Sequence, residues 1–279
     1  MPVAVVTDST CGLPSELIAD LGVRIVPLRV GLGTRSVVDG EILGCDIATA
    51  MRDKVAVSTS RPTPAEFAAV YQATLDAGAS NIVSIHLSAA LSGTWESAVL
   101  ASQDFPHGAV RVVDSKATAM GLGFAVLAAA QVAAAGAGAA TVQGAAIDVI
   151  DRTSVRFYVD TLEHLRRGGR IGTAGALLAT SLAIKPLLQM VEGRIVPLEK
   201  VRTASKALAR LTELTVEAAG EGPVDIAVHH LDSAGRAQSV ADSLRAAVPG
   251  LGQLYVSELG AVLGAHLGPG VIGCVVCRR

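Results

Sequence analysis

The sequence predicts an α/β protein made of two α/β domains. The chain has 279 residues, which is enough for two domains of ordinary size. Hydrophobic residues make up 51% and charged residues 17%, which favours sheets covered on both faces. Short β-branched runs also alternate with helical patterns. We expect a mostly parallel, doubly wound sheet in residues 1–153 and a mixed sheet in residues 154–279.

In the first half, four apolar runs predict the strands of the parallel sheet, with helices between them. The runs cover residues 3–6, 23–30, 81–87 and 110–114. Polar side chains follow three of these strands, in Asp8-Ser9-Thr10, Ser92-Gly93-Thr94 and Asp114-Ser115. Such residues are common caps and turn formers. However, ligands of open α/β sheets bind beyond the carboxyl ends of strands, so their shared position also predicts a binding site.

The segment 58–67 contains a second group of hydroxyls. Thr63, Pro64 and Glu66 fit the N-cap, N1 and N3 positions of a helix with a capping box. Thr59 and Ser60 lie outside that cap and are available to bind a ligand.

The segment 117–147 carries no charged residue and is long enough to span a bilayer. Gln131, Gln143 and the pair Gly136 and Gly138 make a membrane span unfavourable, so we expect two buried helices instead.

The second half predicts a strand at 154–160, a short helix at 161–167 and an apolar helix at 175–183. A hairpin turns at Glu192-Gly193, and a helix covers 203–219. Strands then follow near 225–231 and 253–259, separated by a helix at 236–247, and a last strand covers 271–277. We expect Arg170 and His266 in glycine-rich loops.

Composition and motifs exclude several classes. A formal net charge of -2 and the lack of a basic run argue against nucleic-acid binding. The start MPVAVVTDST has no signal-peptide pattern, so we expect a cytoplasmic protein without a transmembrane segment. Cys274 and Cys277 lie three apart in a strand, so their sulfurs diverge and no metal site is expected. No lysine precedes Ser or Thr, which excludes a P-loop, and no cofactor is predicted.

The remaining pattern fits an anionic ligand. The backbone N–H groups of Gly93 and Thr94, at the start of a predicted helix, attract anions, and Ser92 adds a hydroxyl. A partly buried carboxylate also needs a cation nearby, for which Arg170 and His266 are candidates. A solvated arginine and a loop histidine are the alternatives.

Seven motifs, in order along the whole chain, resemble the DegV family of fatty-acid-binding proteins, which are the binding subunits of the bacterial fatty acid kinase system. They are TDSTCGLP (7–14), TSRPTPAEF (59–67), LSGTWESA (91–98), VVDSKATAMGLG (112–123), TLEHLRRGGRIG (161–172), LAIKPLLQMVEGRIVPLEKVRT (182–203) and HLGPGVIG (266–273).

This resemblance implies that a long-chain fatty acid occupies an apolar channel between or inside the domains, with its carboxylate near the domain interface. Thr59 or Ser60, Ser92, Arg170 and His266 match the family's head-group positions. A separate ATP-dependent fatty acid kinase subunit would then convert the carboxylate to an acyl phosphate for phospholipid synthesis. The helices at 121–135 and 175–183 are candidate channel walls, although ordinary core helices fit equally well.

Arg202 matches an arginine on the family's kinase-facing side, with an ordinary surface arginine as the alternative. Two positions depart from the family pattern, because Arg61 replaces a glutamine and Ala183 replaces an asparagine. These departures concern kinase pairing and head-group geometry.

Two other functions remain open from the residues alone. One is an acyl-ester hydrolase with Ser92 as nucleophile, His266 as base and Asp114 or Asp8 orienting that base. The other is a lipid-responsive regulatory module.

Overall fold

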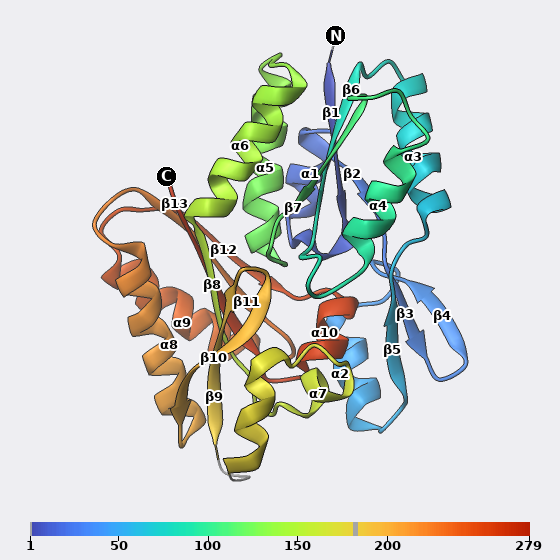
Figure 1. Cartoon of the computed structure of the whole chain (residues 1–279). Coiled ribbons are helices and arrows are strands. Elements are labelled where there is room, and N and C mark those ends of the chain that lie inside the picture. Colours follow the sequence, from blue (N-terminus) through green and yellow to red (C-terminus); the bar gives the residue numbers. More distant parts are fainter. Residues whose placement is uncertain (1, 181–183) are drawn as a thin grey trace. The chain divides into compact units, whose positions relative to one another are not determined.

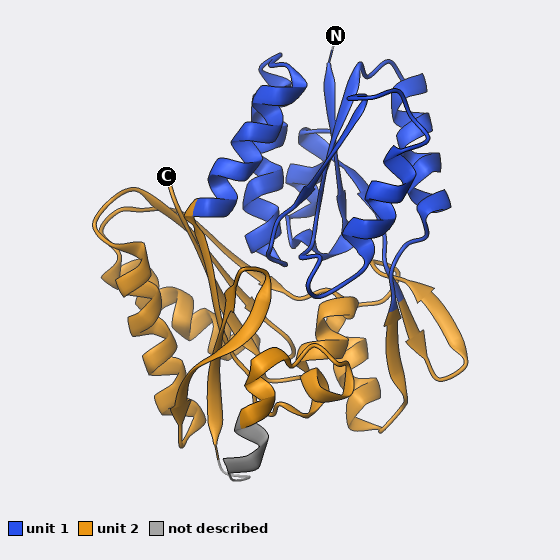
Figure 2. Cartoon of the chain, in the orientation of Figure 1, with its two compact units in different colours: residues 1–29, 60–151 blue, residues 30–59, 152–279 orange. Residues whose placement is uncertain are grey.

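A computed structural model describes residues 2–180 and 184–279, and it divides the chain into two compact units. Unit 1 comprises residues 1–29 and 60–151, and unit 2 comprises residues 30–59 and 152–279 (Figure 2). The two α/β domains expected from the sequence are therefore present. The division differs from the expected one in that residues 30–59 belong to unit 2.

Unit 1 contains a four-stranded, fully parallel sheet in the order β2-β1-β6-β7, as the sequence predicts. Its strands are β1 (Val3–Asp8), β2 (Arg24–Val26), β6 (Asn81–His86) and β7 (Val110–Asp114). The prediction of a single strand over residues 23–30 was wrong, because the chain leaves this sheet after Val26. Pro27, which has no N–H to donate to a ladder, lies at the break.

Helices cover both faces of this sheet, which confirms the doubly wound arrangement (Figure 1). They are η1 (Ser9–Cys11), α1 (Ser15–Asp20), α3 (Pro64–Asp76), α4 (Thr94–Ser102), α5 (Met120–Ala134) and α6 (Ala139–Arg152). One apolar cluster joins Phe67 and Tyr71 of α3 to Val6 and Ile82 of the sheet. The predicted capping box is also confirmed, because Glu66 N donates to Thr63 Oγ1 and Thr63 N donates to Glu66 Oε2.

Unit 2 contains a six-stranded mixed sheet in the order β10-β9-β8-β13-β11-β12. All its neighbouring strands are antiparallel except β11 and β12, which confirms the mixed sheet predicted for this half. The strands are β8 (Thr153–Tyr158), β9 (Lys185–Val191), β10 (Arg194–Val201), β11 (Val224–His230), β12 (Leu251–Glu258) and β13 (Ile272–Arg278).

The helices α8 (Ala204–Ala219) and α9 (Ala234–Ala247) pack on this sheet, and Leu211, Ile226 and Leu244 lie in their shared core. Two short helices, α7 (Glu163–Arg167) and α10 (Ala261–Leu267), contact each other. The apolar helix expected over 175–183 is a 3₁₀ helix, η2 (Gly172–Thr180). The rest of that expected helix, including Ala183, lies outside the described residues.

Residues 30–59 form an insertion that the sequence did not reveal. It contributes a three-stranded sheet in the order β4-β3-β5 and the helix α2 (Gly44–Arg52), which packs against α10. The strands are β3 (Arg29–Leu32), β4 (Arg35–Val38) and β5 (Val57–Ser60). The insertion thereby places Thr59, in its last strand, within unit 2.

Candidate functional site

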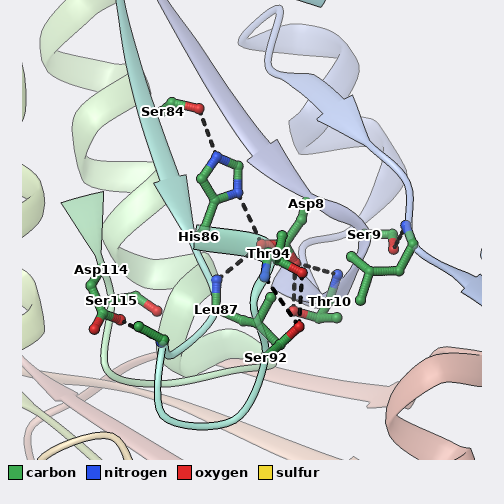
Figure 3. A network of polar contacts seen from close by, with 12 residues as sticks. Asp8, Ser9, Thr10, Ser84, His86, Leu87, Ser92, Thr94, Asp114 and Ser115 are labelled. Atoms are coloured by element: carbon green, nitrogen blue, oxygen red, sulfur yellow. Dashed lines mark hydrogen bonds and ion pairs between the residues drawn. The ribbon is translucent and has the colours of Figure 1, made fainter. Parts of the chain in front are cut away.

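In unit 1, the loops that follow the parallel strands meet at one edge of the sheet, as predicted (Figure 3). Leu87 N, after β6, donates to Asp8 Oδ2 at the end of β1 over 2.9 Å, and Ala89 N donates to Asp114 Oδ1 at the end of β7 over 3.2 Å. The strand order reverses between β1 and β6, which is where open α/β sheets bind their ligands.

The turn Ser92-Gly93-Thr94 lies at this edge and opens α4, with Gly93 as the N-cap residue. Ser92 Oγ lies 2.9 Å from Thr94 Oγ1 and accepts a hydrogen bond from Thr94 N over 3.3 Å. Thr94 is fully buried, whereas Ser92 is half-buried. Ser92 is therefore the side chain of this turn that a ligand can reach.

Arg61, one of the two departures from the family pattern, contacts the same turn. Its Nη1 donates to the carbonyl oxygen of Gly93 over 3.2 Å and to Glu96 Oε2 over 3.1 Å. Both side chains are at least half exposed, so the ion pair contributes less than about 1 kcal/mol to stability. Ser60, the neighbour of Arg61, is exposed at the end of β5.

A buried polar network lies under this edge, and sequence reasoning missed most of it. It contains Asp8, Thr10, Ser84, His86 and Tyr71, each exposed by 2% or less. The sequence placed Asp8 and Thr10 at this edge and offered Asp8 as a residue that could orient His266, but it did not predict their hydrogen bonds to His86 and Leu87. One signal was available, because Ser84 and His86 are two apart in an apolar strand and so face the same side of the sheet.

In unit 2, two predicted site residues that are 207 positions apart contact each other. Thr59 Oγ1 lies 2.8 Å from His266 Nε2. His266 belongs to the last turn of α10, so the expectation that it occupies a glycine-rich loop was wrong. The glycine-rich segment begins only at Gly268, where α10 ends.

The ring of His266, which contacts Thr59, also lies beside the loop that carries Arg170. Arg170 Nη1 donates to the carbonyl oxygen of Gly168 over 2.6 Å, and the Cα of Gly168 packs on the imidazole ring. The Nδ1 atom of His266 is buried and has no hydrogen-bond partner among the described residues. This cluster therefore holds a polar atom whose bonding is incomplete.

Burial, together with the nearby charge of Arg170, lowers the pKa of His266 to about 4. The imidazole is therefore neutral at pH 7. Of the two cations that the sequence offered for this cluster, Arg170 carries the charge and His266 contributes neutral hydrogen-bonding atoms.

The carboxylates proposed for the hydrolase have other roles within unit 1. Asp8 is bonded to His86, and Asp114 Oδ1 accepts hydrogen bonds from the amides of Ala89 and Lys116. His266 has Thr59 as its side-chain partner. No feature of the described structure therefore favours the triad with Ser92.

Arg202 lies between β10 and α8, where it is exposed. Its guanidinium group makes no hydrogen bond or ion pair with the residues that the structure describes. The following residue, Thr203, caps α8 by accepting a hydrogen bond from Lys206 N over 3.4 Å.

Neither a metal site nor a membrane span was found in residues 2–180 and 184–279. These residues contain no group of three or more His, Cys, Asp or Glu side chains placed to hold a metal ion. Among them, no helix has both the length and the apolar character that crossing a membrane requires.

Comparisons with known proteins give a consistent result. The family of uncharacterised proteins named DegV matches residues 2–279. A DegV domain-containing protein of Streptomyces coelicolor is 54% identical over 278 residues, which cover 99% of each chain. Protein DegV of Bacillus subtilis is 34% identical over 285 residues and is matched over 100% of both chains.

Solved structures agree in fold over the full length. A DegV family protein from Thermus thermophilus, described by its fatty acid binding, has a TM-score of 0.95 at 36% identity, with 100% of each chain covered. DegV from Bacillus subtilis, described as a fatty acid binding protein, has a TM-score of 0.90 at 32% identity, again with 100% of each chain covered. The chain therefore belongs to the DegV family.

Proposed function

We propose that this protein is a carrier that binds a long-chain fatty acid. We assign seven residues to its carboxylate, namely Thr59, Ser60, Ser92, Gly93, Thr94, Arg170 and His266. The observation that carries the proposal is the Thr59–His266 hydrogen bond beside the charge of Arg170. The fatty-acid-binding description of the Thermus thermophilus protein supports the ligand class.

The chemistry of these residues favours an acid over an ester or an alcohol. A carboxylate removed from water needs a cation and several donors, which Arg170, the hydroxyl groups and the backbone amides supply. An uncharged head would form weaker hydrogen bonds with the guanidinium of Arg170 than a carboxylate does, because it carries no negative charge.

The acyl chain supplies most of the affinity in this proposal. Burial of about a dozen methylenes at ~0.8 kcal/mol each contributes on the order of 10 kcal/mol. Association costs roughly 4 to 15 kcal/mol in lost translational and rotational freedom, so the two free energies are comparable. The polar residues then fix the orientation of the ligand and its class.

We further propose that the bound acid is presented in the cytoplasm to a separate ATP-dependent kinase. A carboxylate oxygen would attack the γ-phosphorus of ATP, which forms an acyl phosphate for phospholipid synthesis and releases ADP. The lack of a P-loop supports a separate kinase, because this chain has no such sequence for holding ATP phosphates. The exposed Arg202 is our candidate for contact with that partner.

Native mass spectrometry of the purified protein tests the proposal, first for a co-purified acid and then after addition of oleic acid. We expect Ser92→Ala and Arg170→Ala to retain at least 10-fold less acid than the wild type. Arg202→Ala should retain as much as the wild type but lose kinase-dependent acyl phosphate formation. A wild-type protein that takes up no fatty acid would contradict the proposal, and equal loss in all three variants would contradict the assigned roles.

A further inference from the structure

The carboxylate of Asp8 is fully buried, and it joins two loops at the edge of the sheet in unit 1 (Figure 3). Its Oδ1 accepts hydrogen bonds from Thr10 N over 3.0 Å and from Thr10 Oγ1 over 2.6 Å. Its Oδ2 accepts from Leu87 N over 2.9 Å and lies 3.1 Å from His86 Nδ1. Four donors around one carboxylate are consistent with its ionised form, which only accepts hydrogen bonds.

The remaining contacts form a chain of hydrogen bonds with one consistent direction. Because the carboxylate of Asp8 accepts, His86 Nδ1–H donates to it, and in the neutral imidazole this leaves His86 Nε2 as an acceptor. Ser84 Oγ lies 2.6 Å from that nitrogen and Tyr71 OH lies 2.8 Å from Ser84 Oγ, so Ser84 donates to His86 and Tyr71 donates to Ser84. Each of these contacts then has one donor and one acceptor.

Ser84, His86 and Asp8 are connected as a serine-protease triad is, but their surroundings argue against catalysis. All three side chains have zero exposure, so no substrate reaches Ser84 in this conformation. Phe67, with its ring centroid 4.9 Å from that of His86, also packs edge-on against the imidazole. The network therefore has a different role.

Hydrogen bonds connect this network with the loop that carries Ser92. Asp8 fixes the amide of Leu87, the first residue after β6. The next residue, Ser88, accepts a hydrogen bond from Ser92 N over 3.1 Å through its carbonyl oxygen. Loops are held in one conformation when their buried polar groups are fully satisfied.

We propose that Asp8 and His86 are positioning residues that hold the loop of Ser92 in the conformation that binds a carboxylate. The inference rests on the proposed fatty-acid function. Asp8 and His86 do not touch the ligand themselves, because they are fully buried. They act through the loop that starts at Leu87.

The test compares three variants with the wild type, using cis-parinaric acid as a fluorescent fatty acid and urea unfolding to confirm that each is folded. Asp8→Asn replaces one acceptor by a donor that faces other donors, so we expect at least a 10-fold loss of affinity. Ser84→Ala removes the donor to His86, and a loss of about 3-fold is expected. Tyr71→Phe is the matched control, because it keeps the aromatic ring in place and should leave affinity within about 2-fold.

Nitrogen NMR of the His86 ring measures its tautomer ratio and gives a second readout. If Asp8 and His86 only stabilised the fold, the tautomer ratio and the affinity would not change together from variant to variant. We expect the Nδ1–H tautomer in the wild type and in Tyr71→Phe, and a mixture of tautomers in Asp8→Asn. Ser84→Ala should change the tautomer ratio less than Asp8→Asn does. If Asp8→Asn does not fold, Ser84→Ala carries the test through both measurements.

Three results would overturn the inference: wild-type affinity in a folded Asp8→Asn, unchanged affinity and tautomer in Ser84→Ala, or labelling of Ser84 by a fluorophosphonate. If the wild type binds no parinaric acid, it is the proposed function that fails. An Nε2–H tautomer of His86 in the wild type would instead contradict the network itself.

Discussion

Two glycines and two histidines pack against each other where the loop of Arg170 meets the end of α10, which carries His266. The Cα of Gly168, which follows α7, packs on the ring of His266, and the Cα of Gly268, which follows α10, packs on the ring of His164. A Cβ at either glycine would collide with the facing imidazole. The absence of these two side chains therefore sets the position of His266 relative to the loop of Arg170.

We expect Gly168→Ala to weaken fatty acid binding by at least 10-fold, because the new methyl group must displace the His266 ring from Thr59. Gly144→Ala is a suitable control, since a Cβ there has no neighbour within 4 Å. Isothermal titration with a soluble fatty acid measures both. Equal affinity in the two variants would show that the position of the imidazole does not matter.

At the residue scale, the sequence predicts local contacts well and distant ones poorly. The capping box of Thr63 and Glu66 follows from a spacing of three residues, so it is predictable. No pattern connects Thr59 with His266, which meet only because the chain folds back over 207 positions. The resemblance to the DegV family selected both residues for binding, but it did not reveal that they contact each other.

At the scale of elements, the insertion supports the helix that carries His266. Asp39, which is 7% exposed, accepts a hydrogen bond from Val262 N over 3.4 Å and so lies at the N-terminus of α10. A carboxylate at this end of a helix satisfies a free N–H group and interacts favourably with the helix dipole. Asp39 therefore stabilises α10 from a distant part of the chain.

Asp39→Ala should lower the free energy of unfolding by about 1 kcal/mol, which is typical for loss of a helix cap. It should also weaken fatty acid binding, because α10 ends with His266. Asp39→Asn keeps the oxygen acceptor and should restore most of both losses. Urea unfolding and the titration above measure the two effects. An alanine variant as stable as the asparagine variant would argue against capping.

Each element that the sequence missed has its own physical reason. The segment 261–267 is short and contains an internal glycine, so its helical pattern is weak, and α10 packs against the distant helix α2. The run 23–30 reads as one strand because most of its apolar residues are β-branched, and only Pro27 indicates the break. Long, periodic segments such as α5 and α8 were predictable to within a residue or two.

For the whole molecule, a buried neutral histidine makes stability depend on pH. Burial lowers the pKa of His229 to about 4, with a smaller contribution from the charge of His230. An unfolded histidine titrates near pH 6.5, so below that pH the unfolded chain takes up a proton that the folded chain does not. The stabilisation is complete above pH 6.5 and is lost as the pH falls toward 4.

We therefore expect the free energy of unfolding to fall between pH 6.5 and pH 4 by on the order of 3 kcal/mol because of His229 alone. His229→Gln should reduce this slope, since glutamine can still bond to Ser257 but does not titrate. Urea unfolding at intervals across this range measures the slope. Parallel curves for the two proteins would assign the acid sensitivity to other groups.

Unit 2 is built from two separate stretches of the chain, and this limits where its gene can be cut or recombined. Neighbouring codons specify Thr59 and Ser60, yet the two residues belong to different units. A gene fragment that starts at codon 152 would lack α2, and Ile47 could no longer cover Gly264 and its apolar surroundings. Truncation or domain shuffling at that point would therefore expose this apolar surface, and a recombinant that keeps unit 2 whole would have to retain codons 30–59.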